Sequence, residues 1–265
     1  MTMRRCAVIG SPIAHSLSPV LHRAAYGELG LDWVYDRHEV RSDEVVDFVA
    51  KLDDQWRGLS VTMPCKRAIV ALGTPDEIVT ALGVGNTVIF DGRPGDVATT
   101  RIYNTDVTGM EMLLGGEDRG AAFCVYGNGA TARSSIYALS RLGITQVGVR
   151  ARDDEKTQLL ARDAGSWGIE VIPPERTDVL ISTVPAGVAA DWGTASASLV
   201  VDVLYDPWPT PLASLASEQG VRVLTGLDLL AAQAVGQVEL MTGHRVDFSL
   251  LRSAAGGAMA ARSSQ

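Results

Sequence analysis

The sequence predicts an α/β protein built from two domains. Short apolar runs that suit strands alternate with helix-like stretches along the whole chain. Up to residue 103 these runs include a hairpin signal, which indicates a mixed sheet. From residue 104 a different pattern begins, in which an apolar strand, a glycine-rich turn and a helix follow one another. We therefore expect one domain over residues 1–103 plus 238–265 and a second over residues 104–237.

The elements of the first part follow from local signals. Ser18 as cap and Pro19 in the first turn predict a helix over 19–29. The dipeptide Asp91-Gly92 between two apolar runs predicts a hairpin of strands 87–90 and 99–103. A helix after Pro64 is expected to carry Lys66. The remaining expected elements are strands at 6–9, 33–37 and 58–62 and a helix at 43–52, whose apolar residues have helical spacing.

The second part opens with a helix that follows Asn104-Thr105-Asp106 and ends at Gly115-Gly116. A strand over 121–126, a turn over 127–129 and a helix over 130–142 come next. The tail after Leu250 is rich in Ala, Gly and Ser, and it is compatible with a packed helix or with partial disorder. Further strands are expected at 146–149, 170–172, 179–182 and 199–203, and a long apolar helix at 227–242 leads back to the first domain.

Composition limits the function classes. The 265 residues are 46% hydrophobic and 20% charged, as in ordinary soluble proteins, and the net charge of −8 argues against a general nucleic-acid binder. The three cysteines are odd in number and far apart, so we expect reduced thiols and no metal site. The first apolar run is too short for a signal peptide, and no stretch reaches membrane-spanning length. The sequence predicts a cytoplasmic protein without a membrane partner.

Lys66 stands out because 20 of the 23 basic residues are arginine and only three are lysine. Arginine keeps its proton in proteins, whereas an ammonium group can give its proton up. Lys66 closes the segment Ser60-Val61-Thr62-Met63-Pro64-Cys65-Lys66. A lone lysine is most often a solvated surface residue, so its assignment to proton transfer depends on what the neighbouring segments supply.

The turn after the strand at 121–126 fits a dinucleotide-binding pattern. The segment Gly127-Asn128-Gly129-Ala130-Thr131-Ala132 matches G-x-G-x-x-A, between a strand and a helix. Its glycines permit the turn and a close approach of the backbone to a pyrophosphate. At the end of the next strand, Arg150 and Arg152 precede the first acid, which favours the 2′-phosphate of NADP, whereas Asp153 keeps NAD as the alternative.

Four polar clusters fall at predicted strand ends or loops, where binding sites are usually built. Hydroxyl, amide and carboxylate groups are what a polyhydroxylated substrate needs. Each cluster also has a purely structural explanation as a helix cap or a turn. The clusters are Ser16-Leu17-Ser18, Ser60 to Lys66, Gly85-Asn86-Thr87 and Asn104-Thr105-Asp106.

Taken together, the motifs resemble the shikimate dehydrogenase family over nearly the full length and in the family's order. Ser11 to Pro19 looks like the opening loop, and Ser60 to Lys66 resembles N-V-T-x-P-x-K, with Ser60 where the family usually has asparagine. Gly85-Asn86-Thr87 and Asn104-Thr105-Asp106 match two further elements. Segments 205–212 and 226–234 resemble the last two signatures.

The resemblance implies a role for each matching residue. Lys66 and Asp106 are the implied catalytic pair in the reversible reduction of 3-dehydroshikimate to shikimate with NADPH. Lys66 is expected to exchange a proton with the substrate oxygen, and Asp106 is expected to orient Lys66. Two departures concern the nucleotide: Ala151-Arg152-Asp153 replaces the usual N-R-T, and Leu229 replaces a common methionine. The implied substrate-binding residues are Ser16, Ser18, Thr62, Asn86, Tyr205 and Gln233, and the implied cofactor-binding residues are Gly127, Asn128, Gly129, Ala130, Arg150, Arg152, Thr183, Val184 and Gly226.

Three alternatives stay open at this point. A quinate/shikimate dehydrogenase would use the same residues with NAD, although Ser18 favours shikimate. Another lysine-dependent dehydrogenase, such as a methylenetetrahydrofolate dehydrogenase, is opposed by the paired serines and by Asn104-Thr105-Asp106. A regulatory dinucleotide-binding protein without turnover is opposed by the presence of Lys66 and Asp106. The sequence is compatible with a monomer or a homodimer.

Overall fold

The computed structural model describes residues 3–187 and 196–263 and divides into two compact units. The first unit is Met1–Gly109 with Leu230–Gln265, and the second is Met110–Leu229. Two helices run across the division, α4 (Thr105–Leu114) and α8 (Gly226–Thr242). The fold is therefore α/β with two sheets, as the sequence predicts.

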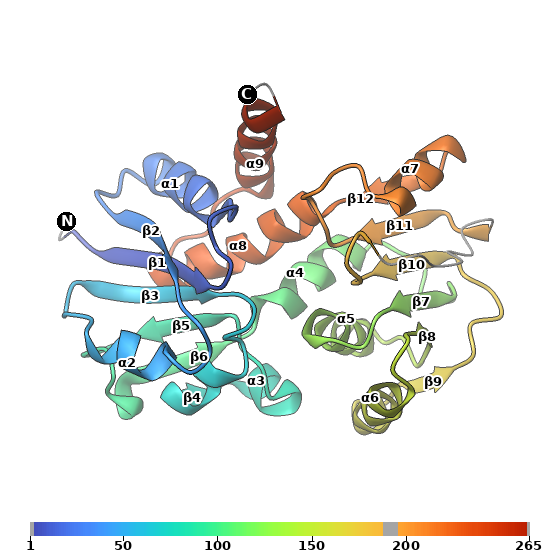
Figure 1. The fold of residues 1–265 in the computed structure, drawn as a ribbon, viewed down its shortest axis with the longest axis horizontal. Coiled ribbons are helices and arrows are strands. Elements are labelled where there is room, and N and C mark those ends of the chain that lie inside the picture. Colours follow the sequence, from blue (N-terminus) through green and yellow to red (C-terminus); the bar gives the residue numbers. More distant parts are fainter. Residues whose placement is uncertain (1–2, 188–195, 264–265) are drawn as a thin grey trace. The chain divides into compact units, whose positions relative to one another are not determined.

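The first unit is built on a six-stranded mixed sheet in the order β2-β1-β3-β5-β6-β4. Strands β1, β2 and β3 are parallel, whereas β5 is antiparallel to both β3 and β6. Figure 1 shows α1, α8 and α9 on one side of this sheet and α2 and α3 on the other. Its elements are β1 (Arg5–Gly10), α1 (Ser18–Glu28), β2 (Val34–Glu39), α2 (Val45–Ala50), β3 (Trp56–Val61), η1 (Ala68–Leu72), β4 (Thr74–Pro75), α3 (Glu77–Leu82), β5 (Thr87–Phe90), η2 (Val97–Thr99), β6 (Thr100–Tyr103) and α9 (Phe248–Ser263).

The hairpin of β5 and β6 is confirmed, with β6 beginning at Thr100, one residue later than expected. Thr87 faces Tyr103 and Phe90 faces Thr100 in the antiparallel ladder. The connection runs from Asp91 through η2, where Asp96 accepts a capping hydrogen bond from the Ala98 N–H. The tail after Leu250 continues α9, which packs against α1.

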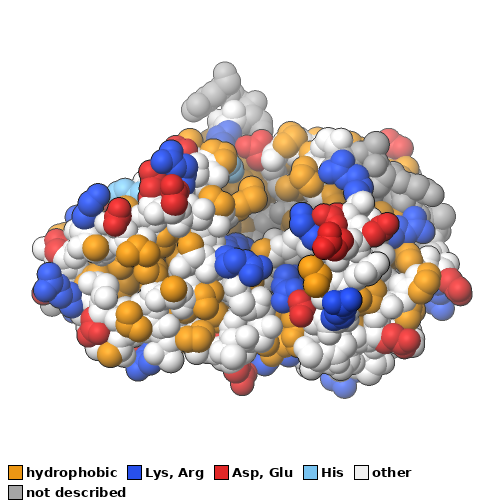
Figure 2. Space-filling view, turned by 60° about the horizontal axis from the view of Figure 1, so that its bottom comes forward, with side chains coloured by type: hydrophobic (Ala, Val, Ile, Leu, Met, Phe, Trp, Pro, Cys, Tyr) orange, Lys and Arg blue, Asp and Glu red, His pale blue; other side chains and the backbone are white. Residues whose placement is uncertain are grey.

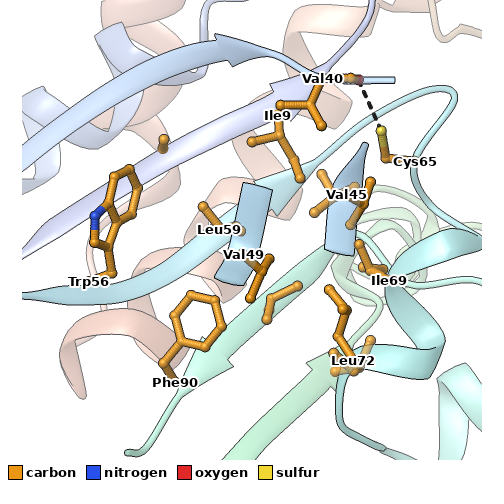
Figure 3. Close-up of a cluster of buried hydrophobic side chains, with 14 of the residues drawn as sticks. Ile9, Val40, Val45, Val49, Trp56, Leu59, Cys65, Ile69, Leu72 and Phe90 are labelled. Carbon is orange, nitrogen blue, oxygen red and sulfur yellow. Dashed lines mark hydrogen bonds between the residues drawn. The ribbon is translucent and has the colours of Figure 1, made fainter. Parts of the chain in front are cut away.

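An apolar cluster on the α2 side of the sheet includes Cys65 and Ile69, the one directly before Lys66 in the chain and the other three residues after it (Figure 3). Leu59 and Ile69 are completely buried there, and burying a side chain of this size contributes about 1.5–3 kcal/mol. Cys65 belongs to the same cluster, and its Sγ donates to the Val40 carbonyl at 3.1 Å. The residue before Lys66 is thus fixed in the core.

The second unit is built on a fully parallel sheet in the order β12-β11-β10-β7-β8-β9. The chain proceeds from β7 outward through β8 to β9, and then returns to β10 and proceeds the other way. Because such crossovers are right-handed, helices from the two halves cover opposite faces. Its elements are β7 (Phe123–Tyr126), α5 (Ala130–Arg141), β8 (Gln146–Arg150), α6 (Asp154–Ser166), β9 (Glu170–Ile172), β10 (Val179–Ser182), β11 (Leu199–Asp202), α7 (Pro211–Glu218) and β12 (Arg222–Leu224).

The distribution of surface charge and the length of the helices can be compared with what nucleic-acid binding and membrane insertion require. Figure 2 shows basic and acidic side chains interspersed over the face in view, which is unlike the basic stripe of a nucleic-acid binder. Within residues 3–187 and 196–263, no helix combines the length and the apolar character needed to cross a bilayer.

Candidate functional site

The four polar clusters meet at one edge of the first sheet. β1 and β3 are parallel neighbours, so the opening loop and the Lys66 segment leave the sheet at the same edge. Because β5 is antiparallel to β3, its first residue Thr87 pairs with Ser60, and Asn86 lies at that edge too. Tyr103 at the end of β6 also pairs with Thr87, which places Asn104 to Asp106 beside them.

The opening loop is held by three separate parts of the first unit. The Ser11 hydroxyl donates to Glu39, and the Ser11 N–H donates to the Met63 carbonyl. Arg37 donates to the Ala14 carbonyl. From α9, Arg262 donates to the His15 carbonyl at 2.9 Å. The loop conformation is therefore set before any ligand arrives.

The predicted capping role of Ser18 is wrong. Ser18 is the first residue of α1, and the cap position is Leu17, which makes no capping bond with its side chain. Pro19 lies in the first turn, as expected, where its missing N–H costs no helical hydrogen bond. Ser16 and Ser18 are only 8% and 7% exposed, and Ser16 Oγ accepts from the Ser18 N–H. The Ser18 hydroxyl is not used to start the helix.

Lys66 lies in a turn and not on a helix, contrary to the expectation from Pro64. The regular 3-10 helix η1 begins two residues later, at Ala68. The turn is tied to β1 because the Thr62 N–H donates to the Ile9 carbonyl. Burial raises the pKa of the Cys65 thiol to about 11, so this thiol stays protonated and keeps its hydrogen bond to Val40. Lys66 is thus presented by an anchored turn between Thr62 and Ile69.

Lys66 and Asp106 form an ion pair with 2.5 Å between Nζ and Oδ2. Their side chains are 17% and 8% exposed. Asn104 places the carboxylate, because its Oδ1 accepts from the Asp106 N–H at the start of α4. A charge-assisted bond in a mostly buried place is stronger than one in water. The pair presents a proton donor whose charge is balanced by one carboxylate.

Asn86 connects this pair to α8. Its Nδ2 donates to Asp106 Oδ1 at 3.0 Å and to Gln233 Oε1 at 2.9 Å. Four of the predicted site residues, Lys66, Asp106, Asn86 and Gln233, are therefore in one hydrogen-bonded group. α4 and α8 approach closely here, since a Cβ on Gly109 would lie 2.9 Å from the backbone nitrogen of Gln233.

Sequence reasoning missed the buried polar residues behind this group. Tyr35 and Gln237 were not noted at all, and Ser60, Thr87 and Thr105 were named only within the polar clusters, without a site role of their own. A signal was available, because Gln237 lies inside an apolar helix and polar residues are rarely fully buried without a role.

In the second unit, the predicted phosphate turn lies where the strand order reverses, between β7 and β10. Ligands of open α/β sheets bind at such a switch point. Gly127 has φ +110°, and a Cβ there would lie 2.3 Å from Thr183 Oγ1 and 3.4 Å from Val184 Cγ1. Gly129 precedes α5, so the first N–H groups of α5 face the turn. A Cβ on Gly129 would meet nothing within 4 Å, so the backbone at the start of α5 is open to a phosphate group.

The arginine segment follows β8 on the same edge. Gly127 N–H donates to the Arg150 carbonyl at 2.8 Å, and the Arg150 guanidinium lies 5.9 Å from the Tyr126 ring centre. Arg150 and Arg152 are exposed. The Asn128 amide turns toward α6, donating to the Asp153 carbonyl and to Thr157 Oγ1.

Asp153 is already used as the cap of α6. Its carboxylate accepts from the Lys156 N–H at 2.9 Å and pairs with the Lys156 ammonium at 3.2 Å. The Lys156 N–H is the main reason that the pKa of Asp153 is lowered, with the Lys156 side chain next. Asp153, which left NAD as an alternative cofactor, therefore has a structural role. Arg150 and Arg152, which precede it, are exposed.

Two further predicted residues lie on the carboxyl side of the second sheet. Gly226 donates its N–H to the Leu204 carbonyl, and a Cβ there would lie 2.4 Å from the Val203 oxygen. Only glycine allows this approach. Tyr205 follows β11 and is half-buried in the second unit, whereas the other predicted substrate residues are in the first.

Comparison with known proteins gives the family. A model described as the shikimate dehydrogenase substrate binding domain matches residues 8–88. The shikimate dehydrogenase (NADP(+)) of Shouchella clausii is 34% identical, and the alignment covers 91% of this chain and 94% of the relative.

Solved structures agree with this assignment. The shikimate dehydrogenase of Mycobacterium tuberculosis superposes with a TM-score of 0.87 at 34% identity, over 96% of this chain and 99% of that one. The Thermus thermophilus enzyme in complex with NADP(H) and shikimate gives a TM-score of 0.82 at 28% identity, over 97% and 100%. The motifs, the geometry of both units and these likenesses agree, and the chain belongs to the shikimate dehydrogenase family.

Proposed function

We propose that this chain is an NADP-dependent shikimate dehydrogenase, which reversibly reduces 3-dehydroshikimate to shikimate in chorismate and aromatic amino-acid biosynthesis. The observation that carries the proposal is the hydrogen-bonded group of Lys66, Asp106, Asn86 and Gln233. The same activity is named for the relatives that match this chain over most of its length.

The reaction requires a proton at the oxygen of the substrate ketone. Lys66 Nζ donates that proton as negative charge develops on the oxygen, and it takes the proton back during oxidation. Asp106 keeps the ammonium oriented and accepts from the substrate hydroxyl. Ser16 and Ser18 bind the carboxylate of the substrate, and Thr62, Asn86, Gln233 and Tyr205 contact its hydroxyl groups and ring.

The second unit fits NADP through its glycine cradle and its exposed arginines. When bound, the nicotinamide supplies the hydride. The turn at Gly127, Asn128, Gly129 and Ala130 would hold the pyrophosphate by backbone N–H groups. Arg150 and Arg152 would pair with the 2′-phosphate, while Asp153 stays with α6. Thr183, Val184 and Gly226 complete the nucleotide site.

The two units then have different roles in the reaction. The unit of residues 1–109 and 230–265 binds substrate and carries the proton chemistry, and the unit of residues 110–229 binds NADP. Cys6, Cys65 and Cys124 are free thiols, which supports action in the reducing cytoplasm.

A spectrophotometric assay tests the proposal. Shikimate and quinate are each oxidised with NADP and with NAD, and kcat/KM is compared. We expect shikimate with NADP to be preferred over shikimate with NAD by roughly tenfold or more, since charge-assisted bonds to a phosphate are worth about 1.5–3 kcal/mol. Preference for quinate and NAD would favour the quinate/shikimate dehydrogenase alternative. Binding of NADPH without turnover of either substrate would instead indicate a regulatory protein.

A further inference from the structure

Behind the catalytic pair lies a chain of buried polar side chains that we call the Ser60 network. It consists of Tyr35 on β2, Ser60 on β3, Gln237 on α8 and Thr87 on β5, with His22 on α1 beside it. All five are at most 3% exposed. Most buried polar groups in proteins are hydrogen-bonded, so the contacts of these side chains define their arrangement.

The donor and the acceptor of each hydrogen bond in the network can be assigned. Gln237 Nε2 lies 3.4 Å from the Asn86 carbonyl oxygen, which can only accept, so this atom must be the amide nitrogen. Gln237 Oε1 then accepts from Ser60 Oγ at 2.8 Å and from His22 Nε2 at 3.3 Å. Because Ser60 uses its proton on Gln237, it accepts from the Tyr35 hydroxyl at 2.6 Å.

The network continues to the Asn86 side chain. Gln237 Nε2 donates to Thr87 Oγ1 at 3.2 Å, and Thr87 Oγ1 in turn donates to Asn86 Oδ1 at 2.9 Å. From α4, the Thr105 N–H also donates to Asn86 Oδ1 at 2.8 Å. The Thr105 hydroxyl donates to the same oxygen at 3.1 Å, so three donors from two different elements fix which end of the Asn86 amide is oxygen.

This orientation matters because the other end of the amide faces Asp106. Asn86 Nδ2 lies 3.0 Å from Asp106 Oδ1, while Lys66 holds Asp106 Oδ2. A flipped Asn86 would put its oxygen against a carboxylate oxygen, which is repulsive and leaves the carboxylate one donor short. The Asp106 carboxylate keeps both of its partners only while Asn86 keeps its orientation.

We propose that Ser60 and Gln237 are positioning residues: through Thr87 they hold the Asn86 amide with its N–H groups toward Asp106 and Gln233, and so keep Lys66 and Asp106 aligned. This rests on the proposed function for its kinetic consequence, although the orientation of Asn86 can be measured without turnover. The Ser60 hydroxyl donates to Gln237 and accepts from Tyr35, so both of its hydrogen-bonding functions are used.

The experiment compares Gln237→Met, Ser60→Ala and Tyr35→Phe with a matched control. Gln237→Met keeps the length of the side chain and removes every polar contact at this position. We expect kcat for shikimate to fall about tenfold in Gln237→Met, the scale of one bond to a charged group, and less in Ser60→Ala and Tyr35→Phe. KM for NADP should be unchanged.

The control is Thr100→Val, which removes a fully buried hydroxyl of the same sheet that donates to the Asp96 carbonyl at 2.8 Å. It should lower the melting temperature without moving kcat. Equal kinetics in Gln237→Met and Thr100→Val at similar melting temperatures would overturn the proposal. If Gln237→Met does not fold, the same comparison is decided by Ser60→Ala.

A second measurement separates this inference from the proposed function. The side-chain amide signals of Asn86 are assigned in ¹⁵N–¹H spectra by their loss in Asn86→Asp. We expect slow hydrogen exchange in the wild type and in Thr100→Val, and faster exchange with shifted signals in Gln237→Met and Ser60→Ala. Unchanged Asn86 signals would refute the positioning role whether or not the wild type oxidises shikimate. Absence of wild-type turnover would count against the proposed function alone.

Discussion

The two units build their sites by different means. In the first unit the group around Lys66 consists of side chains, and each is held by at least one other side chain from a distant segment. In the second unit the phosphate turn at Gly127 consists of backbone and of the space left by missing side chains, with exposed arginines beside it.

This difference follows from what each site has to recognise. A small polyhydroxylated substrate requires several donors and acceptors at fixed positions, and mutual hydrogen bonds fix them in advance. A pyrophosphate carries its own charge, and a helix N-terminus with close backbone approach is sufficient. A substitution in the first unit should therefore disturb chemistry, and one in the second should disturb cofactor affinity.

The largest effect on catalysis is expected at Lys66, in the first unit. Lys66→Ala should lower kcat by roughly two to four orders of magnitude, because the proton donor is gone. Lys66→Arg should lose most of the activity too, although it keeps the charge, because guanidinium does not release its proton. Steady-state kinetics of shikimate oxidation measures both.

The control for this prediction is Lys51→Arg, which changes an exposed lysine of the same unit. It should leave kcat within twofold or so of the wild type, as surface substitutions usually do. Near-normal turnover in Lys66→Arg would refute the assignment of proton transfer to Lys66.

The buried network should make the first unit sensitive to acid through His22. Burial lowers the pKa of His22 from its ordinary 6.5 to about 4. Between these two values the unfolded chain binds a proton that the folded chain does not, so the free energy of unfolding falls as pH falls. The loss is about 3 kcal/mol and is complete near pH 4. The rings of Tyr26 and Tyr35 around His22 stay neutral in this window, because burial raises the pKa of both.

Denaturant unfolding between pH 7 and pH 4 measures this effect. His22→Phe should be less stable than the wild type at pH 7 but should show a shallower loss toward acid. His244→Gln replaces an exposed histidine and should retain the steep loss. An unchanged slope in His22→Phe would show that another group controls the acid sensitivity.

The smallest of the three effects is expected at Gly127. Gly127→Ala places a Cβ against Thr183 in a backbone conformation that costs a non-glycine residue about 1–3 kcal/mol, and it should raise KM for NADP roughly tenfold. kcat at saturating NADP should change much less. Thermal unfolding and NADP titration measure the two consequences separately.

Gly220→Ala provides the matched variant, because Gly220 also has a positive φ, of +70°, but a Cβ there meets nothing within 4 Å. It should lose less stability than Gly127→Ala, because only the backbone strain applies, and it should leave KM for NADP unaltered. If both variants raise KM equally, the Gly127 turn is not where the phosphates bind.

The sequence predicted most of the second unit, because its signals are local. The strands at 170–172 and 179–182 have the predicted bounds, and the turn at Gly127 lies between a strand and a helix as expected. Hydrophobic runs and glycine turns are readable from neighbouring residues. The role of Asp153 was harder to see, since an acid after a strand suits both a ribose contact and a helix cap.

The first unit was predicted in outline and not in its contacts. The hairpin of β5 and β6 and the meeting of the polar clusters followed from strand signals and family motifs. The turn at Lys66 was expected to be helical because Pro64 suits a first helical turn. In the structure the Lys66 carbonyl accepts from the Gly85 N–H of a distant segment, and not from the Val70 N–H four residues on. The Ser60 network joins residues up to 215 positions apart, and such pairs leave no local pattern.

The contact between Tyr35 and Ser60 also constrains how these positions can vary. The two hydroxyl oxygens are 2.6 Å apart in a place without exposed surface, so the combined size of the two side chains is limited. An asparagine at position 60, which the resemblance of this segment to N-V-T-x-P-x-K led us to expect, would extend into the volume that the Tyr35 hydroxyl occupies. Relatives with that asparagine should therefore have a shorter side chain at position 35, and replacing either residue alone should be less tolerated than exchanging both.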